Sequence, residues 1–484
     1  MAKTTAKPKK TAKTTRSKAA KPAVKKTGAT GSSAPKASRA WEPYAIGGAV
    51  LVILGVNALL GRSESPWAWR VASFLGIPFI LGLALLISRD RRRIQLRTVF
   101  VGLGLQLAVA ILALLTPVGT AIFKVIACVF DVIFTVSAEG ASFVFGPLSG
   151  LLPESAFPAD NRVVLAVTLV SIIVFMGAVT RMLYHLGVMQ LVVRAMAWLM
   201  RRVMRTSGAE SLSAGANVFV GMVEAPLTIR PYVAGLTRSE LFCVMTAGMA
   251  TVAGSVLAFY AMLLKGVLGE AAAGHLLTAS IMSAPAAIVM AKIIIPESDT
   301  PATLDSDVVP ALEDEDEKPV NLMDAAARGG LDGMKLGISV VGLLIAFVAL
   351  VALANTILSA ATVGHVTFDK LAGWLFSPVA AGIGVPLRDS VEAGGLMGTK
   401  TVLNELLAYK DLARVGATMT PHSARVMSYA LCGFANFGSV AIMIAGIGGI
   451  APKRRGDLAR LGLLSIVSGT LAAFMTGCWA GLLG

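Results

Sequence analysis

Two short segments place polar side chains in an otherwise apolar chain. Residues 217–226 read Asn-Val-Phe-Val-Gly-Met-Val-Glu-Ala-Pro, which brings the amide of Asn217 and the carboxylate of Glu224 together with two helix breakers. A much later segment offers the same pair of groups in Asn404 and Glu405. Because an idle charge is costly inside lipid, such groups are typical of a site that binds a substrate or an ion. The pattern predicts two half-sites whose carboxylates, Glu224 and Glu405, meet in one cavity halfway through a membrane.

The composition of the 484-residue chain is that of a membrane protein. Apolar residues make up 55% of the chain and charged residues only 15%, and the mean hydropathy is +0.74. These values are too apolar for a water-soluble protein of this length. Lipid cannot satisfy open backbone groups, so each crossing of roughly 20 residues is expected to be a helix. The predicted fold class is an all-α polytopic membrane protein with about nine transmembrane helices, two inverted re-entrant hairpins and interfacial helices.

The net charge of +15 is concentrated near the N-terminus. Residues 1–40 contain twelve Lys or Arg and no acid, which leaves little net charge for the rest of the chain. Mixed with Ala, Thr, Ser and Pro, this segment cannot build a core and is predicted to be a disordered cytoplasmic tail. We expect the tail to touch anionic lipid headgroups rather than nucleic acid, which is the alternative partner for a basic segment.

Nine apolar stretches have the length of a membrane-spanning helix. They are residues 42–61, 67–88, 96–116, 162–184, 239–266, 275–296, 335–360, 424–449 and 458–482. Two further apolar segments, 118–146 and 365–385, are interrupted by charge, Gly or Pro, and the run 187–205 is rich in Arg. These three are predicted to lie along the membrane interface.

The stretches divide the chain into six parts. The parts are a basic tail (1–40), an extra N-terminal transmembrane helix (41–66), scaffold and interfacial helices (67–206), a first hairpin with a broken helix (207–274), scaffold helices with an acidic loop at 297–334 (275–386), and a second hairpin with a broken helix and the final helix (387–484).

Basic clusters set the predicted orientation, because short cytoplasmic segments retain Lys and Arg. If the tail is inside, the clusters at Arg89–Arg93, Arg201–Arg202 and Lys453–Arg455 all fall on the cytoplasmic side. The odd number of crossings then places the C-terminus outside.

A weak internal repeat links the two polar segments. Each unit is a hairpin-length segment, at 208–236 or 388–412, followed by a helix whose middle is rich in small and hydroxyl residues. These middles, 250–255 and 433–439, are predicted to unwind and to free backbone carbonyls for ligands. Counting crossings, the two hairpins enter the membrane from opposite sides, which predicts an inverted pair.

Several separate motifs occur in the order typical of one known family. They are Ala216-Asn-Val-Phe-Val-Gly221, Glu224-Ala-Pro226, Ile229-Arg-Pro231, Ser239-Glu-Leu-Phe242, Gly398-Thr-Lys-Thr-Val402 with Asn404-Glu405, Tyr429-Ala-Leu-Cys-Gly-Phe-Ala-Asn-Phe437 and Ala451-Pro-Lys-Arg-Arg455. Over roughly residues 70–484 the chain resembles the concentrative nucleoside transporters, a family of cation-coupled nucleoside importers. The resemblance implies a homotrimer whose protomers each have a scaffold and a mobile transport domain built from the two hairpins and the two broken helices.

The resemblance also implies roles for individual residues. The residues expected to bind substrate are Glu224, Met222, Val256, Glu405, Phe434, Asn436 and Ser439. Glu405, Asn436 and Ser439 would hold the ribose hydroxyls, Phe434 and Val256 would line the pocket, and Glu224 would lie on the nucleobase side. The expected sodium site comprises Asn217, Val220, Val223, Thr251 and Val252, largely through backbone carbonyls.

Two residues depart from the family pattern, which has Gly-Gln-Thr-Glu or a close variant where this chain has Gly221-Met-Val-Glu224. Met222 cannot hydrogen-bond as an amide does, and Val223 lacks the hydroxyl of Thr, a hard oxygen suited to sodium. Sodium coupling is therefore expected to be weakened or replaced. We hypothesise proton coupling through Glu224, so that the coupling ion is sodium or a proton.

Structural roles are the alternative for several of these residues. Glu224 and Glu405 would also suit helix ends that reach water. Lys400 is expected to be a structural partner or a snorkelling cation rather than a ligand. Thr251 and Ser255 are also expected to suit hydrogen bonds back to the preceding helical turn.

The predicted function is secondary active import of nucleosides across the bacterial inner membrane by cation symport, with an elevator-type movement. An enzyme is not expected, because the sequence has no H-E-x-x-H, nucleophile elbow or paired metal-ligand cluster, and no cofactor beyond the coupling ion is predicted. The alternatives are a non-transporting nucleoside sensor and an uncoupled nucleoside facilitator, the latter favoured by Val223.

Overall fold

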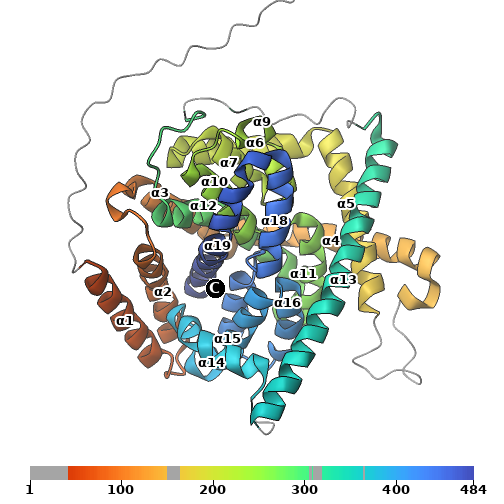
Figure 1. Cartoon of the computed structure of the whole chain (residues 1–484). Coiled ribbons are helices and arrows are strands. Elements are labelled where there is room, and N and C mark those ends of the chain that lie inside the picture. The colour runs from red at the N-terminus through yellow and green to blue at the C-terminus, as the bar shows by residue number, and fades with distance from the viewer. Residues whose placement is uncertain (1–41, 150–163, 305–307, 309–318, 363–365) are drawn as a thin grey trace, which may run out of the picture. The chain divides into compact units, whose positions relative to one another are not determined.

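Helices make up the regular structure of the computed structural model, which describes residues 42–149, 164–304, 308, 319–362 and 366–484 (Figure 1). Eight described helices are long and apolar enough to cross a membrane, or nine if the bent pair α14 (Phe368–Gly382) and α15 (Leu387–Val402) counts as one crossing. The prediction of an all-α polytopic protein is confirmed. The predicted basic tail lies outside the described residues, as does the stretch 309–317 of the acidic loop.

The first three helices agree with the predicted crossings. They are α1 (Glu42–Leu60), α2 (Pro66–Leu86) and α3 (Leu96–Leu115), with a short 3-10 turn η1 (Arg91–Arg93) between the last two. Helix α1 lies outside the part of the chain that carries the family resemblance. It packs on α2, where Val50 fills the space at Gly82, and the amide of Asn57 donates to the carbonyl of Gly382 at 2.8 Å.

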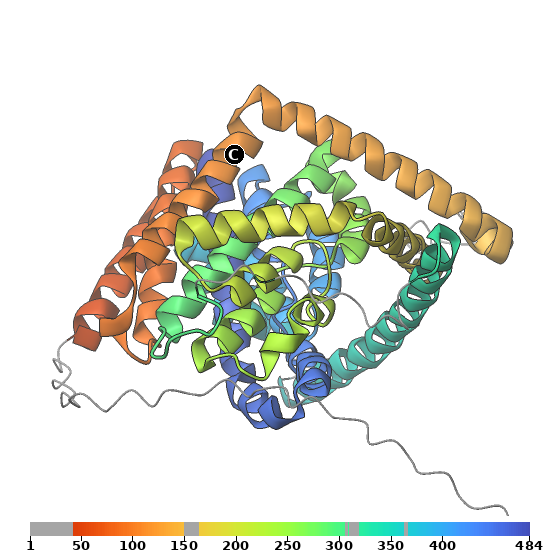
Figure 2. The same ribbon diagram turned by 90° about the horizontal axis from the view of Figure 1, so that it is seen from above.

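Two segments predicted to lie along the interface form the helices α4 (Pro117–Phe145) and α6 (Val188–Met204). Figure 2, which views the molecule from above, shows α4 along its whole length, so its axis runs across the vertical direction of Figure 1. Together with its 3-10 end η2 (Gly146–Ser149), α4 is also apolar and long enough for a crossing. Between them lies α5 (Leu165–His185), which matches a predicted crossing.

Both predicted hairpins and both broken helices are present. The first hairpin contains α7 (Gly208–Ala216), α8 (Glu224–Leu227) and α9 (Arg230–Val233), and the half-helices α10 (Arg238–Ala250) and α11 (Gly254–Leu268) follow it. The second hairpin contains α15 and α16 (Glu405–Val415), followed by the half-helices α17 (Pro421–Ala430) and α18 (Phe437–Ile450). In Figure 1, α7 and α9 lie at the top while α15 and α16 lie at the bottom, so the hairpins enter from opposite ends, as predicted.

Hydrogen bonds gather the predicted cytoplasmic segments at one end of the bundle. The backbone N–H of Arg89, after α2, donates to the carbonyl of Ile294 at the end of α12 (Ala272–Ile294) at 2.9 Å. The guanidinium of Arg454, just before α19 (Arg455–Leu483), donates to the carbonyl of Leu236 at 2.6 Å. The basic segments after α2 and before α19 therefore lie at the same end as the start of α10.

The opposite end collects the segments predicted to lie outside. The backbone N–H of Leu387, at the start of the second hairpin, donates to the carbonyl of Gly61 at 3.1 Å. The guanidinium of Arg70, in the first turns of α2, donates to the C-terminal Gly484 at 2.9 Å. The C-terminus thus lies at the end of the bundle from which the second hairpin enters.

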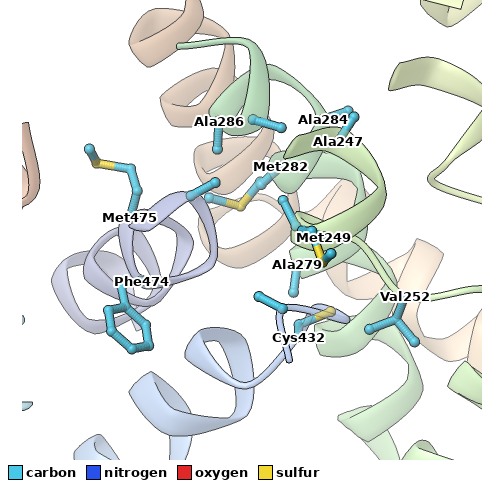
Figure 3. Packing of buried hydrophobic residues seen from close by; sticks show 14 of the residues in the cluster. Ala247, Met249, Val252, Ala279, Met282, Ala284, Ala286, Cys432, Phe474 and Met475 are labelled. Carbon is cyan, nitrogen blue, oxygen red and sulfur yellow. The ribbon is translucent and has the colours of Figure 1, made fainter. Parts of the chain in front are cut away.

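The helices α12 and α19 form the centre of the bundle, and nearly all of α12 is buried. Figure 3 shows the side chains of Ala279 and Met282 from α12 fitted against Met249 of α10 and Cys432 of the second break. Small and sulfur-containing residues allow this close packing. Helices α2, α3 and α12 pack on α19 or α10.

Helix α13 (Leu322–Thr362) begins earlier than its sequence predicts. Its start at Leu322 instead of near 335 ends the acidic loop before the predicted boundary at 334. The reason is local: the side chain of Asn321 accepts the N–H of Asp324 at 2.9 Å, and Arg328 pairs with Asp324 one turn later at 3.0 Å. A cap and an i,i+4 pair stabilise a helix start that hydropathy alone does not indicate.

Glycines hold α13 against α5 with their backbones in contact. A Cβ added at Gly177 of α5 would lie 2.5 Å from the carbonyl of Gly329, and one at Gly333 would lie 2.7 Å from the carbonyl of Ile173. Helices approach this closely only where side chains are missing. The α5–α13 pair is therefore one rigid unit along the part of its length where these glycines lie.

The variant Gly333→Ala should lower the apparent Tm of the solubilised protein, because overpacking a backbone contact costs about 1–3 kcal/mol. The matched control is Gly342→Ala on the same helix, where an added Cβ meets nothing within 4 Å. Thermal unfolding followed by tryptophan fluorescence checks this. Equal Tm values for the two variants would contradict the tight α5–α13 contact.

Candidate functional site

A cavity of about 560 Å³ lies between the first hairpin and the α5–α13 pair. Val220 and Glu224 of the hairpin line one side, together with Ser255 of the first break. The facing wall includes Arg181 of α5 and Asp332 of α13. A space of this size, with a few polar groups on mostly apolar walls, suits a small-molecule ligand.

Glu224 faces this cavity from the start of α8. Its side chain is exposed, and its carboxylate folds back over Gly221, where an added Cβ would collide with it. Glycine at position 221 is therefore needed for this conformation of the carboxylate. The structure places Glu224 where a ligand entering the cavity would meet it.

Glu405 lies in a different setting, buried at the start of α16. The hydroxyl of Tyr260 donates to its Oε1 at 2.7 Å, and the amide of Asn436 donates to its Oε2 at 3.2 Å. The amide oxygen of Asn436 accepts the N–H of Ser439 at 2.8 Å and so caps α18. These bonds join the second hairpin, the second broken helix and α11 around one carboxylate.

Tyr260 is a member of this group that the sequence did not indicate. It lies in the apolar half-helix α11, where a buried phenol needs a hydrogen-bond acceptor. The sequence therefore indicates that Tyr260 needs an acceptor. It does not indicate which one, because Glu405 is far away in the sequence.

Glu405 is not part of the lining of this cavity, although the sequence predicts that the two carboxylates meet in one. Glu224 and Ser255 face the 560 Å³ cavity, whereas Glu405 binds Tyr260, more than a helical turn further along α11 from Ser255. The physical reason is that Tyr260 and Asn436 satisfy Glu405 from within the protein. The described structure therefore contains two polar sites. Glu224 faces the open cavity, and Glu405 is enclosed by its hydrogen-bond partners.

The other residues expected to bind substrate also lie outside the cavity wall. Val256 and Ser439 are buried, and Met222 packs against Gly248 of α10. Phe434 is half-buried, and its backbone N–H donates to the carbonyl of Thr251 at 3.2 Å. Of the predicted substrate residues, Glu224 alone lines the cavity in the described structure.

The residues expected to hold a cation surround the first break. Asn217 is fully buried, its Nδ2 donates to the carbonyl of Ser213 at 3.0 Å, and its Oδ1 has no hydrogen-bond partner among the described residues. A buried carbonyl-type oxygen without a donor is an oxygen that a cation could satisfy. Thr251 donates its hydroxyl back to Ala247 at 2.9 Å, the back-bonding alternative, which leaves the lone pairs of that oxygen available.

The three valines of this set can offer only backbone carbonyls. Val252 is buried and Val220 lies at the cavity wall. The side chain of Val223 packs against Gly446 of α18, where an added Cβ would meet it at 2.7 Å. The set therefore fits a hard monovalent cation through Asn217, Thr251 and carbonyl oxygens, with an apolar contact where Thr would supply a hydroxyl.

Two inverted hairpins, two broken helices and a ligand-sized cavity beside the first break are the arrangement typical of membrane transporters. Three family profiles together match most of the chain between residues 75 and 481. They are "Na+ dependent nucleoside transporter N-terminus" at residues 75–148, "Nucleoside recognition" at 166–266 and "Na+ dependent nucleoside transporter C-terminus" at 275–481.

Known proteins of the same kind match over nearly their full length. The chain is 42% identical to the uncharacterized transporter YutK of Bacillus subtilis, over 84% of this chain and 98% of that protein. It is 34% identical to the nucleoside permease NupC of Helicobacter pylori, over 85% and 97% respectively. The solved structure of CNTnw in an inward-facing substrate-bound state superposes with a TM-score of 0.79 at 39% identity, over 85% of this chain and 97% of that one. The chain belongs to the concentrative nucleoside transporter family and is a nucleoside transporter, not an enzyme, by fold and family.

The variant Glu405→Gln should reduce nucleoside uptake by about 10- to 100-fold, because two donors then meet an amide with a single acceptor oxygen. The matched control is Glu392→Gln, an exposed residue of the same hairpin. Initial rates of labelled nucleoside uptake into proteoliposomes check this. Near-normal uptake by Glu405→Gln would remove Glu405 from the binding site.

Proposed function

We propose that the chain imports nucleosides across the bacterial inner membrane by sodium symport, through an elevator-type movement of its hairpins. The observation that carries the coupling is the buried Oδ1 of Asn217, which lies beside the first break and has no partner among the described residues. A coupling ion bound there would link the hairpin to the broken helix. The membrane potential supplies about 2.3 kcal/mol per charge per 100 mV, so one sodium ion is enough to drive uphill import.

The ribose of the substrate is proposed to bind Glu405, Asn436 and Ser439. A carboxylate accepts hydrogen bonds from sugar hydroxyls, and an amide and a hydroxyl can complement it. Glu405 is held between Tyr260 and Asn436. Each carboxylate oxygen has a further lone pair, so a ribose hydroxyl can add to this arrangement. Phe434 and Val256 would line the same pocket.

Sodium is favoured over a proton by the neutral oxygens of the predicted cation site. Asn217 and Thr251 offer neutral oxygens, which bind a cation but cannot carry a titrating proton. The matched profile is also that of a sodium-dependent family.

The cavity supports the proposed movement because of where it lies. One wall is the rigid α5–α13 pair, and the other is the first hairpin and its broken helix. Since α13 packs mainly on α5, the hairpin body can slide past the pair without breaking the pair's own contacts. The pair would be the fixed part, and in the proposed homotrimer it would form the centre.

The proposed orientation places the basic segments in the cytoplasm. The segments after α2 and before α19 share one end of the bundle, and the C-terminus lies at the other. With the positive end inside, the N-terminus is cytoplasmic and the C-terminus is outside. Labelling of single cysteines at the two termini in intact cells tests this assignment.

The decisive experiment measures labelled nucleoside uptake into proteoliposomes under one imposed gradient at a time. A sodium gradient should drive accumulation above the external concentration, and a pH gradient without sodium should not. Accumulation driven only by the pH gradient would overturn sodium coupling. Equilibration without accumulation would identify an uncoupled facilitator, and binding without uptake would identify a sensor.

The variant Asn217→Leu should raise the sodium concentration for half-maximal uptake at least about tenfold, since even residues that only support a metal ligand contribute 10–100-fold in affinity. The matched control is Gln106→Met, because Gln106 is also a buried amide whose oxygen lacks a partner, but it lies in α3. An unchanged sodium response in Asn217→Leu would show that the cation binds elsewhere.

A further inference from the structure

Lys400 is a lysine that the proposed function leaves without a role. It lies in α15 of the second hairpin and is 0% exposed. Its ammonium donates to the carbonyl of Ala430 at 2.8 Å and lies 5.7 Å from the ring centre of Phe474. No carboxylate forms an ion pair with it within the described part of the chain. A snorkelling lysine would reach water, so that interpretation is wrong for Lys400.

The partner of Lys400 is the free end of a half-helix. Ala430 is the last residue of α17, where the second broken helix stops. The last carbonyls of a helix lack intrahelical partners and carry the negative end of the helix dipole. The ammonium of Lys400 therefore lies where a positive charge stabilises the helix end.

The first repeat has a different arrangement at the corresponding place. There the first arm of the hairpin, α7, is followed by Asn217, whose oxygen lacks a partner, and the half-helix α10 ends at Ala250. In the second repeat the first arm, α15, supplies Lys400 to the end of α17. One break thus presents an oxygen that needs a cation, and the other presents a carbonyl that already has one.

We propose that the ammonium of Lys400 is a tethered cation that takes, at the second break, the place that a free coupling cation takes at the first. This inference rests on the proposed sodium coupling at the first break. It assigns Lys400 as a positioning residue, which fixes the end of α17. It also implies that each protomer draws a single coupling cation from solution.

The inference predicts that charge, and not bulk, is what Lys400 contributes. Lys400→Met keeps an apolar chain of similar length but removes the ammonium, and Lys400→Arg keeps a cation. Lys400→Met should lose uptake by about tenfold or more, because the last carbonyl of α17 is left without its charged donor. Lys400→Arg should retain more uptake than Lys400→Met. Equal loss in both variants, or full activity in Lys400→Met, would overturn the inference.

A second measurement uses Lys400→Ala, which leaves space for a small amine. Propylammonium chloride should raise the apparent Tm of this variant in detergent and restore part of its uptake, whereas 1-propanol should do neither. The matched control is Lys400→Met, whose side chain fills the same space, so propylammonium should leave this variant and the unmodified protein unchanged.

The readouts separate this inference from the proposed function. The Tm shift needs no transport, so it tests the tethered cation even if sodium does not drive uptake. Sodium-driven uptake in the unmodified protein, with no propylammonium response in Lys400→Ala, would overturn the role of Lys400 alone. The curve of uptake rate against sodium concentration should also become steeper in Lys400→Ala, because a second site for a free cation is then open.

Discussion

The structure depends on one constraint, which is that no backbone polar group can be left open in lipid. Two helices nevertheless stop halfway, after Ala250 and Ala430. The freed groups find partners elsewhere in the protein: Gly254 donates to the carbonyl of Phe219 in the first hairpin at 3.0 Å, and Phe434 of the second break donates to the carbonyl of Thr251 in the first break at 3.2 Å. The second of these bonds requires the two breaks to touch. Gly433 permits this contact, because an added Cβ would lie 2.8 Å from the carbonyl of Met249. Close contact between backbones also explains the small residues of the surrounding helices.

Satisfying the breaks in different ways gives the two halves of the repeat different chemistry. The second break is complete within the protein, since Lys400 meets the end of α17 and Asn436 caps the start of α18. The first break is not, since Ala253 precedes α11 without a side-chain cap and the oxygen of Asn217 lacks a partner among the residues described. An inverted repeat therefore need not bind the same ligand twice. A break whose polar groups are all satisfied by protein side chains can present fixed groups to a sugar. A break that leaves an oxygen without a donor can respond to an ion.

Much of the fold follows from sequence because it rests on local signals. Hydropathy gives the crossings, and the small and hydroxyl residues near 250–255 and 433–439 give the breaks. Features that hydropathy does not report were missed. The Asn321 cap starts α13 early, and glycine contacts hold α13 against α5. At the site, motif resemblance named Glu405 and Asn436, but not Tyr260. Whether Glu224 and Glu405 share a cavity depends on which partners satisfy each carboxylate, and these partners come from distant parts of the chain.

The separation of the two carboxylates bears on how a ligand reaches the deeper one. Ser255 at the cavity wall and Tyr260 at Glu405 belong to the same half-helix, α11. In the proposed binding mode, a ligand in the cavity would pass along the first turns of α11 to reach the carboxylate. The hydroxyl of Tyr260 already makes the kind of bond that a ribose hydroxyl would make, so Glu405 stays satisfied while no ligand is bound. This matters energetically, because a buried charge left without donors would destabilise the closed arrangement by more than a typical hydrogen bond contributes. Tyr260 and Asn436 thus allow the site to keep a charged acceptor inside the membrane between rounds of binding.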